Sequence, residues 1–141
     1  MLYNLNPAIW GSTFWDTLYY IGVTYPENPT SDDKKIIINF INAFQYVLPC
    51  ETCRSHFSQN LIQIPLSDNV LSSRYNFITW LVAVNNEVNK RLNKKIITIE
   101  YIVNKYTSSK KIEKETDCTI MITIILIILL IVLLVLYVKF R

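Results

Sequence analysis

Residues 49–57, with the sequence PCETCRSHF, join two predicted helices and carry two of the three cysteines in the chain. The residue before a proline disfavours the α-helical region, so one helix ends at Leu48 and Pro49 begins the connection to the next. Cys50 then stands at the start of a new helix, three residues before Cys53. The positive end of a helix dipole lowers thiol pKa values and favours the reactive thiolate, which makes this pair a candidate redox centre.

Four interpretations of the Cys50–Cys53 pair can be weighed: a zinc site, a thioredoxin-type motif, a reduced pair in an apolar core and a redox-active dithiol. A zinc site needs two more ligands and usually draws on a second close pair, whereas only His56 and Cys118 remain here as soft candidates. A thioredoxin-type motif needs a strand before the cysteines, but the preceding segment has a helical pattern. The polar neighbours of the two cysteines argue against a reduced pair in an apolar core. We therefore expect a redox-active dithiol.

Outward from this pair, apolar residues recur in steps of three and four and predict an all-α fold. The chain has only two glycines, no hairpin signal, and five prolines where helices could begin or end. About 105 residues can bury one core, so we expect a four-helix bundle with a short fifth helix. The predicted helices are residues 8–25, 31–48, 50–62, 73–93 and 100–106, with a polar loop at 66–72.

An uncharged apolar run, TIMITIILIILLIVLLVLYV, occupies residues 119–138. Twenty helical residues at about 1.5 Å each span the roughly 30 Å hydrocarbon core of a bilayer, so we expect a transmembrane helix. Residues 107–118 would form a polar stalk before it, and residues 139–141 a short basic tail. Residues 1–10 have neither a basic n-region nor a long apolar core, so we expect no signal peptide. We therefore expect a tail-anchored single-pass membrane protein whose domain, residues 1–106, lies on the cytoplasmic side.

The charge balance argues against nucleic acid as the main partner. Twelve of the fourteen basic residues and all eleven acidic residues precede the apolar run, so the domain is near neutral. A nucleic-acid-binding domain would carry a basic stripe. Three cysteines are also too few for a disulfide scaffold.

A dithiol on a helical bundle needs a cofactor to pass two electrons to oxygen, and two groups of residues could hold an aromatic one. Aromatic stripes at helical spacing form core more often than a cofactor site. The aromatic group here is Trp10, Trp15, Tyr19, Trp80 and Tyr106. Asn85 and Asn89 share a helix face at i, i+4, and with Asn86 they form an unusually asparagine-rich stretch. That face could bond a polar ligand edge or could be a solvated surface strip.

Three blocks, in order along the chain, resemble the Erv/Alr family of FAD-linked sulfhydryl oxidases, and most of all its short viral members. Residues 10–19, WGSTFWDTLY, resemble the first-helix motif, in which a Trp is followed by Leu-His. Residues 25–57 contain the Tyr-Pro, Phe and Pro-Cys-x-x-Cys-x-x-His-Phe elements of the second block. Residues 80–92, WLVAVNNEVNKRL, resemble the Trp-Leu-Cys-x-x-His-Asn-x-Val-Asn-x-x-Leu block.

The resemblance implies an enzyme that holds FAD non-covalently at one end of a four-helix bundle. From the lack of a second close pair of ligands we expect no metal site. The enzyme would join two protein thiols into a disulfide and reduce oxygen to hydrogen peroxide. Cys53 would be the cysteine next to the flavin, and Cys50 would exchange with substrate thiols. The residues that match FAD-lining positions are Trp15, His56, Trp80, Asn86, Val88, Asn89 and Lys90, with Gly11, Ser12, Tyr19, Asn85 and Tyr106 as further candidates.

The resemblance also implies partners and a location. The substrate would be a dithiol protein, either thioredoxin-like or a small CxxC protein, that carries oxidation to virion proteins. Family members are usually dimers through the first two helices, so we expect a homodimer. The anchor would hold the enzyme at a virion membrane or at the host membrane where virions assemble. The alternative is a non-catalytic, tail-anchored membrane adaptor whose CxxC is structural.

The chain departs from the family pattern at several positions. Tyr19 and Asn85 each stand where a histidine is usual. Val82 replaces one cysteine of the family's structural disulfide, and no cysteine lies near residue 98 to pair with it. No second CxxC is present to act as a shuttle. Cys118 could be a single-cysteine shuttle, a bridge between protomers, a palmitoylation site or an inert thiol.

Overall fold

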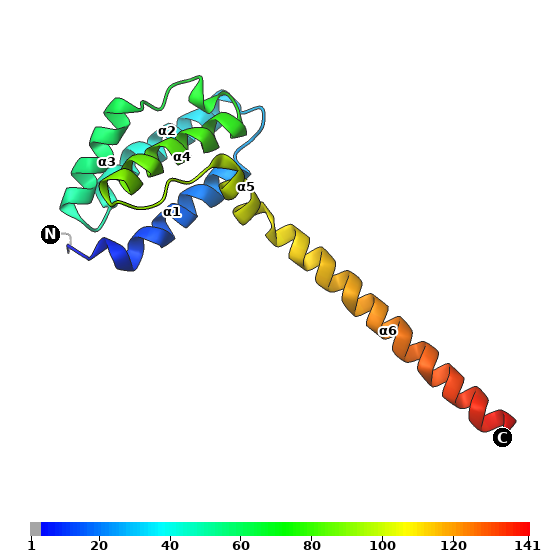
Figure 1. Cartoon of the computed structure of the whole chain (residues 1–141). Coiled ribbons are helices and arrows are strands. Elements are labelled where there is room, and N and C mark those ends of the chain that lie inside the picture. The colour runs from blue at the N-terminus through cyan, green and yellow to red at the C-terminus, as the bar shows by residue number, and fades with distance from the viewer. Residues whose placement is uncertain (1–3) are drawn as a thin grey trace. The chain divides into compact units, whose positions relative to one another are not determined.

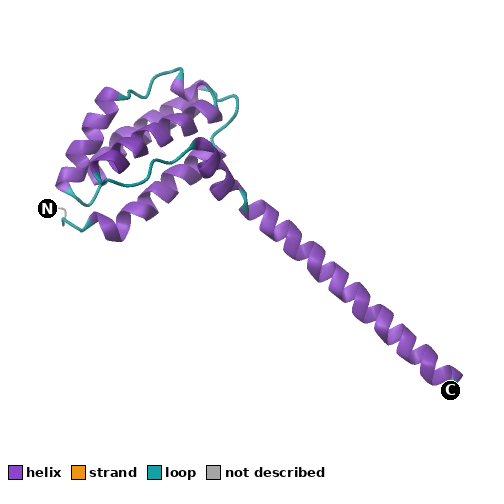
Figure 2. Ribbon diagram, viewed as in Figure 1, coloured by secondary structure: helices purple, strands orange, loops and turns teal. Residues whose placement is uncertain are grey.

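Helices are the only regular structure in the part of the chain that the computed structural model describes, residues 4–141 (Figure 1). For residues 109–119 it describes the backbone alone. Figure 2 shows loops between the helices and no strand in this part, which confirms the predicted all-α class. The chain forms two compact units that meet in sequence between Tyr106 and Thr107. The helices are α1 Pro7–Thr24, α2 Ser31–Val47, α3 Glu51–Gln63, the 3-10 helix η1 Val70–Ser72, α4 Arg74–Arg91, α5 Ile99–Thr107 and α6 Ser109–Phe140.

Side-chain caps set the starts of the first two helices. The Asn6 side chain accepts a hydrogen bond from the Ala8 N–H at 3.0 Å, and Pro7 occupies the first position of α1. Thr30 and Asp33 form a capping box at α2, in which each side chain accepts from the other residue's N–H. Hydrogen bonds from the Thr30 side chain and backbone hold the pKa of Asp33 below its ordinary value.

α1 and α4 approach closely at Gly22, a residue without a side chain. A Cβ added there would lie 2.8 Å from Leu81 Cδ1 and 3.5 Å from Ile78 Cγ1, both on α4. This contact is in the core of the first unit, which draws apolar residues from all five of its α-helices, as the helical spacing predicted. The core includes Leu18, Tyr19, Ile37, Ile41, Phe44, Phe57, Phe77, Trp80, Leu81, Val84 and Ile102.

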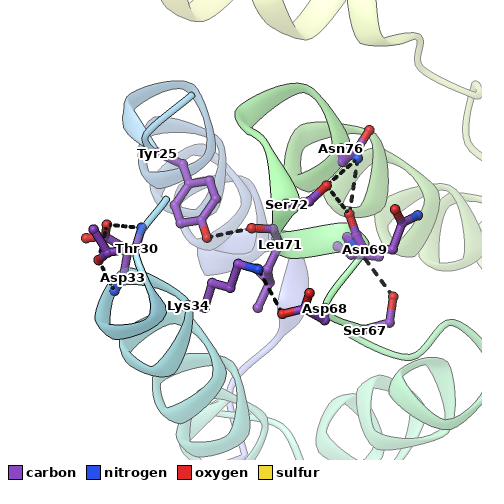
Figure 3. A network of polar contacts seen from close by, with 11 residues as sticks. Tyr25, Thr30, Asp33, Lys34, Ser67, Asp68, Asn69, Leu71, Ser72 and Asn76 are labelled. Atoms are coloured by element: carbon purple, nitrogen blue, oxygen red, sulfur yellow. Dashed lines mark hydrogen bonds and ion pairs between the residues drawn. The ribbon is translucent and has the colours of Figure 1, made fainter. Parts of the chain in front are cut away.

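The loop between α3 and α4 has more structure than its polar sequence predicts. Figure 3 shows the contacts that fix it. The Tyr25 hydroxyl donates to the Leu71 carbonyl at 3.0 Å, and Lys34 Nζ lies 2.8 Å from Asp68 Oδ1. Leu71, within η1, is fully buried. The prediction of a polar loop at 66–72 therefore holds for its exposed centre, residues 67–69, while Leu71 near its end is buried in the core.

α6 belongs to the second unit and contains the predicted membrane span. Ile120–Phe140 has 21 residues, a mean hydropathy of 3.5 and no buried share, so it is long and apolar enough to cross a membrane. The segment that we expected to be a polar stalk runs directly into it, because a single helix begins at Ser109 and continues to Phe140.

Candidate redox site

The Cys50–Cys53 pair lies at the N-terminal end of α3. Cys50 is the N-cap residue, with an extended backbone, and its Sγ accepts a hydrogen bond from the Cys53 N–H at 3.1 Å. A disulfide joins the two residues, whose Cα atoms are 5.1 Å apart. After reduction, a thiolate on Cys53 would lie in the first turn of α3, where the helix dipole favours negative charge. The local geometry therefore suits a reversible disulfide.

N-terminal residues lie against Cys50. The Leu5 N–H donates to the Pro49 carbonyl at 2.7 Å, and the Glu51 N–H donates to Asn4 Oδ1 at 3.4 Å. The N-terminal segment is thus bonded to the backbone on both sides of Cys50, a residue that is only 7% exposed. The exchange with substrate thiols that we expect of Cys50 needs more access than this conformation gives.

Aromatic residues pack against the inner face of α3. The Phe57 ring lies 6.4 Å from the Trp15 ring of α1 and 5.6 Å from the Phe44 ring of α2, measured between centroids. At the C-terminal end of α3, the Trp80 indole N–H donates to the Ile64 carbonyl at 2.9 Å. Trp15 is partly exposed and Trp80 is buried. Two tryptophans predicted to line FAD therefore lie against the helix that carries the cysteines.

Tyr19 and Asn85 bond to each other inside the bundle. The Asn85 Nδ2 donates to the Tyr19 hydroxyl at 2.7 Å, and both side chains are buried. Burial is the main cause that raises the pKa of Tyr19, so the phenol stays neutral. The two positions at which the family usually has histidine therefore hold a neutral, mutually bonded pair.

Tyr106 of α5 is fixed to α1 through Asp16. The Tyr106 hydroxyl donates to Asp16 Oδ1, and Lys105 Nζ lies 3.3 Å from the same oxygen and 3.0 Å from the Tyr106 hydroxyl. The hydrogen bond with Tyr106 is the main cause that raises the pKa of Lys105. The Tyr106 ring also lies 5.3 Å from the Tyr19 ring. Asp16 was not among the predicted site residues, although it is the only charged residue in α1.

Asn86 ties the segment after α4 to that helix. Its Nδ2 donates to the Ile97 carbonyl and its Oδ1 accepts from the Ile97 N–H, both at 3.0 Å. This reciprocal pair lies next to residue 98, near which the family's second structural cysteine would stand, while Val82 is buried in the core. Lys90, another predicted FAD residue, bonds Glu87 at 2.6 Å.

The structure thus brings Trp15, Tyr19, Asn85 and Tyr106 together by direct contacts. Asn86 and Lys90 bond to their own surroundings instead. The remaining predicted residues are exposed or partly buried: Gly11, Ser12, His56, Val88 and Asn89.

Asn60 was not predicted as a site residue, yet it is fully buried on α3. Neither its Nδ2 nor its Oδ1 has a hydrogen-bond partner among the described residues. The sequence could have predicted its burial, because Asn60 follows Phe57 by three residues and so lies on the same, inner face of the helix.

Among the described residues, no three His, Cys, Asp or Glu side chains lie close enough together to hold a metal ion. The predictions about Cys118 concern a side chain outside the described part.

Comparison with known proteins agrees with the three sequence blocks. A model of the Erv1/Alr family matches residues 12–116. A probable FAD-linked sulfhydryl oxidase of Acanthamoeba polyphaga mimivirus is 39% identical over 111 residues, which cover 76% of this chain and 78% of that protein. An FAD-linked sulfhydryl oxidase of African swine fever virus is 38% identical over 100 residues, which cover 71% and 82%. The crystal structure of the FAD binding domain of Erv1 from Saccharomyces cerevisiae has a similar fold, with a TM-score of 0.67 at 23% identity over 73% of this chain and 95% of that one. This chain therefore belongs to the Erv1/Alr family.

Proposed function

We propose that this chain is an FAD-linked sulfhydryl oxidase that converts pairs of protein thiols into disulfides. The observation that carries the proposal is the Cys50–Cys53 disulfide at the start of α3, inside a helical bundle of the Erv1/Alr family. Relatives at 38% and 39% identity carry the name FAD-linked sulfhydryl oxidase.

The residues around α3 fit FAD. A flavin ring needs flat apolar contacts and a few polar partners, and the ring contact between Trp15 and Phe57 lies one turn from Cys53. Asn60, one turn further along, adds a buried amide with no partner among the described residues. Trp15 and His56 would hold the cofactor together with the other predicted residues. When bound, FAD accepts the electron pair of the reduced cysteines and transfers it to oxygen, giving hydrogen peroxide.

The two cysteines perform the thiol chemistry. A substrate thiolate attacks Cys50 Sγ, and a new S–S bond forms as the Cys50–Cys53 bond breaks and Cys53 leaves as a thiolate. The first turn of α3 stabilises that thiolate, and a leaving thiol of lower pKa leaves faster. The second substrate thiolate then attacks the substrate sulfur of the mixed disulfide and releases Cys50. Two electrons have passed from the substrate to the cysteine pair.

The location follows from α6. Its apolar part, Ile120–Phe140, would anchor the chain in a membrane, with the bundle on the cytoplasmic side. The support for this orientation is a cluster of lysines before the span, at positions 105, 110, 111 and 114, against two basic residues after it. The viral relatives support a place at a virion or assembly membrane.

The partners are a dithiol protein, thioredoxin-like or a small CxxC protein, and a second copy of the chain. Large apolar side chains lie exposed on the first two helices, and a dimer through these helices would remove apolar surface from water. They are Ile9, Tyr20, Ile36, Ile38, Tyr46 and Val47.

The test is oxygen consumption by the purified full-length chain in detergent, with dithiothreitol as the dithiol. We expect turnover by the wild type and by Cys118→Ser, and none by Cys53→Ser. Full turnover by Cys53→Ser would overturn the assigned role. A folded wild type that consumes no oxygen would favour the membrane adaptor instead.

A further inference from the structure

The Asn60 side chain is a buried polar group without a bonding partner. Only two polar side chains are buried among the described residues, Asn60 and Asn85. Asn85 donates to the Tyr19 hydroxyl, whereas both amide atoms of Asn60 lack a partner there. A buried amide without hydrogen bonds destabilises a fold, and leucine has a similar branched shape without that penalty. An asparagine at this position therefore indicates a partner from outside the chain.

The position of Asn60 on α3 points to the cofactor region. Asn60 follows Cys53 by seven residues, which is two helical turns on the same face and about 10 Å along the axis. Phe57, between them, contacts Trp15, and Ile64, one turn beyond Asn60, accepts a bond from Trp80. Asn60 thus lies between the turn of α3 that contacts Trp15 and the turn that contacts Trp80.

We propose that the Asn60 amide hydrogen-bonds the polar pyrimidine edge of the FAD isoalloxazine ring. This inference rests on the proposed function and adds a cofactor-binding residue to it. That edge has carbonyl acceptors on either side of an N–H donor, and an asparagine amide offers both a donor and an acceptor. An amide two turns from Cys53 satisfies the polar edge of a ring whose other contacts are aromatic.

The competing occupant is an ordered water molecule. Buried waters commonly satisfy buried polar groups, and a single one could bond both amide atoms. Water would stabilise the protein equally with and without FAD, whereas a flavin contact contributes only in the FAD-bound protein. The two occupants therefore predict different effects of removing the amide.

The experiment compares Asn60→Leu with wild type as full-length protein in detergent. FAD is titrated into FAD-free protein and binding is followed by quenching of flavin fluorescence. We expect the FAD dissociation constant of Asn60→Leu to rise about tenfold, the loss typical of one or two hydrogen bonds. The thermal midpoint of the FAD-free variant should equal or exceed that of the FAD-free wild type. Gln59→Leu makes the same change on the exposed face of the same helix and should alter neither quantity.

Two results would overturn the inference. One is a dissociation constant for Asn60→Leu within twofold of wild type. The other is an equal fall in thermal midpoint with and without FAD, which identifies water as the partner. If Asn60→Leu does not fold, Asn60→Ala is measured against the same thresholds. A wild type that binds no FAD would refute the proposed function itself, which separates that failure from a failure of Asn60.

Discussion

The buried pair of Tyr19 and Asn85 gives the sharpest prediction about the fold. Tyr19→Phe keeps the ring and removes the hydroxyl that Asn85 Nδ2 reaches at 2.7 Å. Because Asn85 is only 7% exposed, water does not replace the lost partner. A buried donor left unpaired costs about 1–3 kcal/mol, and we expect the FAD-free protein to lose that much stability. Asn85→Leu should cost a similar amount, since it strands the Tyr19 hydroxyl.

The double variant Tyr19→Phe with Asn85→Leu separates this explanation from simple loss of packing. Replacing both partners by apolar groups leaves nothing unpaired, so the double variant should lie closer to wild type than the sum of the single losses. Urea unfolding in detergent, followed by tryptophan fluorescence, measures the first unit alone, because all three tryptophans precede residue 107. Strictly additive losses, or single variants within about 0.5 kcal/mol of wild type, would refute the reasoning.

Three further predictions follow from other contacts. Gly22→Ala places a Cβ 2.8 Å from a side-chain carbon of α4 and should destabilise the first unit by about 1–3 kcal/mol in the same urea assay; an unchanged midpoint would show that the neighbour moves freely. The lowered pKa of Asp33 means that its capping bonds stabilise the fold above the ordinary carboxyl pKa and are lost as the pH falls through the folded value; Asp33→Asn should therefore flatten the acid end of the stability profile, and an identical profile would contradict this. Leu5→Pro removes the N–H that bonds the backbone beside Cys50, so iodoacetamide should label Cys50 faster in the reduced protein, as read by peptide mass spectrometry; equal labelling rates would mean that the N-terminal segment does not limit access.

Local patterns in the sequence predict the helices well because each one buries an apolar stripe and ends near a proline or a capping residue. The predicted helix from residue 50 to 62, for example, is observed as Glu51–Gln63. Leu71 shows the limit of such patterns, because its loop has no apolar periodicity, yet its side chain is fully buried in the core and its carbonyl accepts a bond from Tyr25, 46 residues away. The burial of such a residue depends on contacts with residues far away in the sequence, which local patterns do not predict.

The site residues also differ in how far local sequence predicts them. The CxxC pair is visible in the sequence because its chemistry depends on local spacing at a helix start. The bond between Tyr19 and Asn85 joins residues 66 positions apart, and Asp16 meets Tyr106 across 90, so no local pattern predicts either contact. Asn60 is one of several polar residues in α3, and only its burial distinguishes it from exposed neighbours such as Gln59.

The most direct test of the central claim is the visible spectrum of the purified full-length chain during anaerobic reduction. The account predicts a yellow protein with a flavin band at about 450 nm. Dithiothreitol should bleach the band in the wild type, because electrons reach the flavin through Cys50 and Cys53, and should leave it largely unchanged in Cys53→Ser. A folded, colourless protein, or equally fast bleaching in Cys53→Ser, would contradict the claim that this cysteine pair transfers electrons from thiols to FAD.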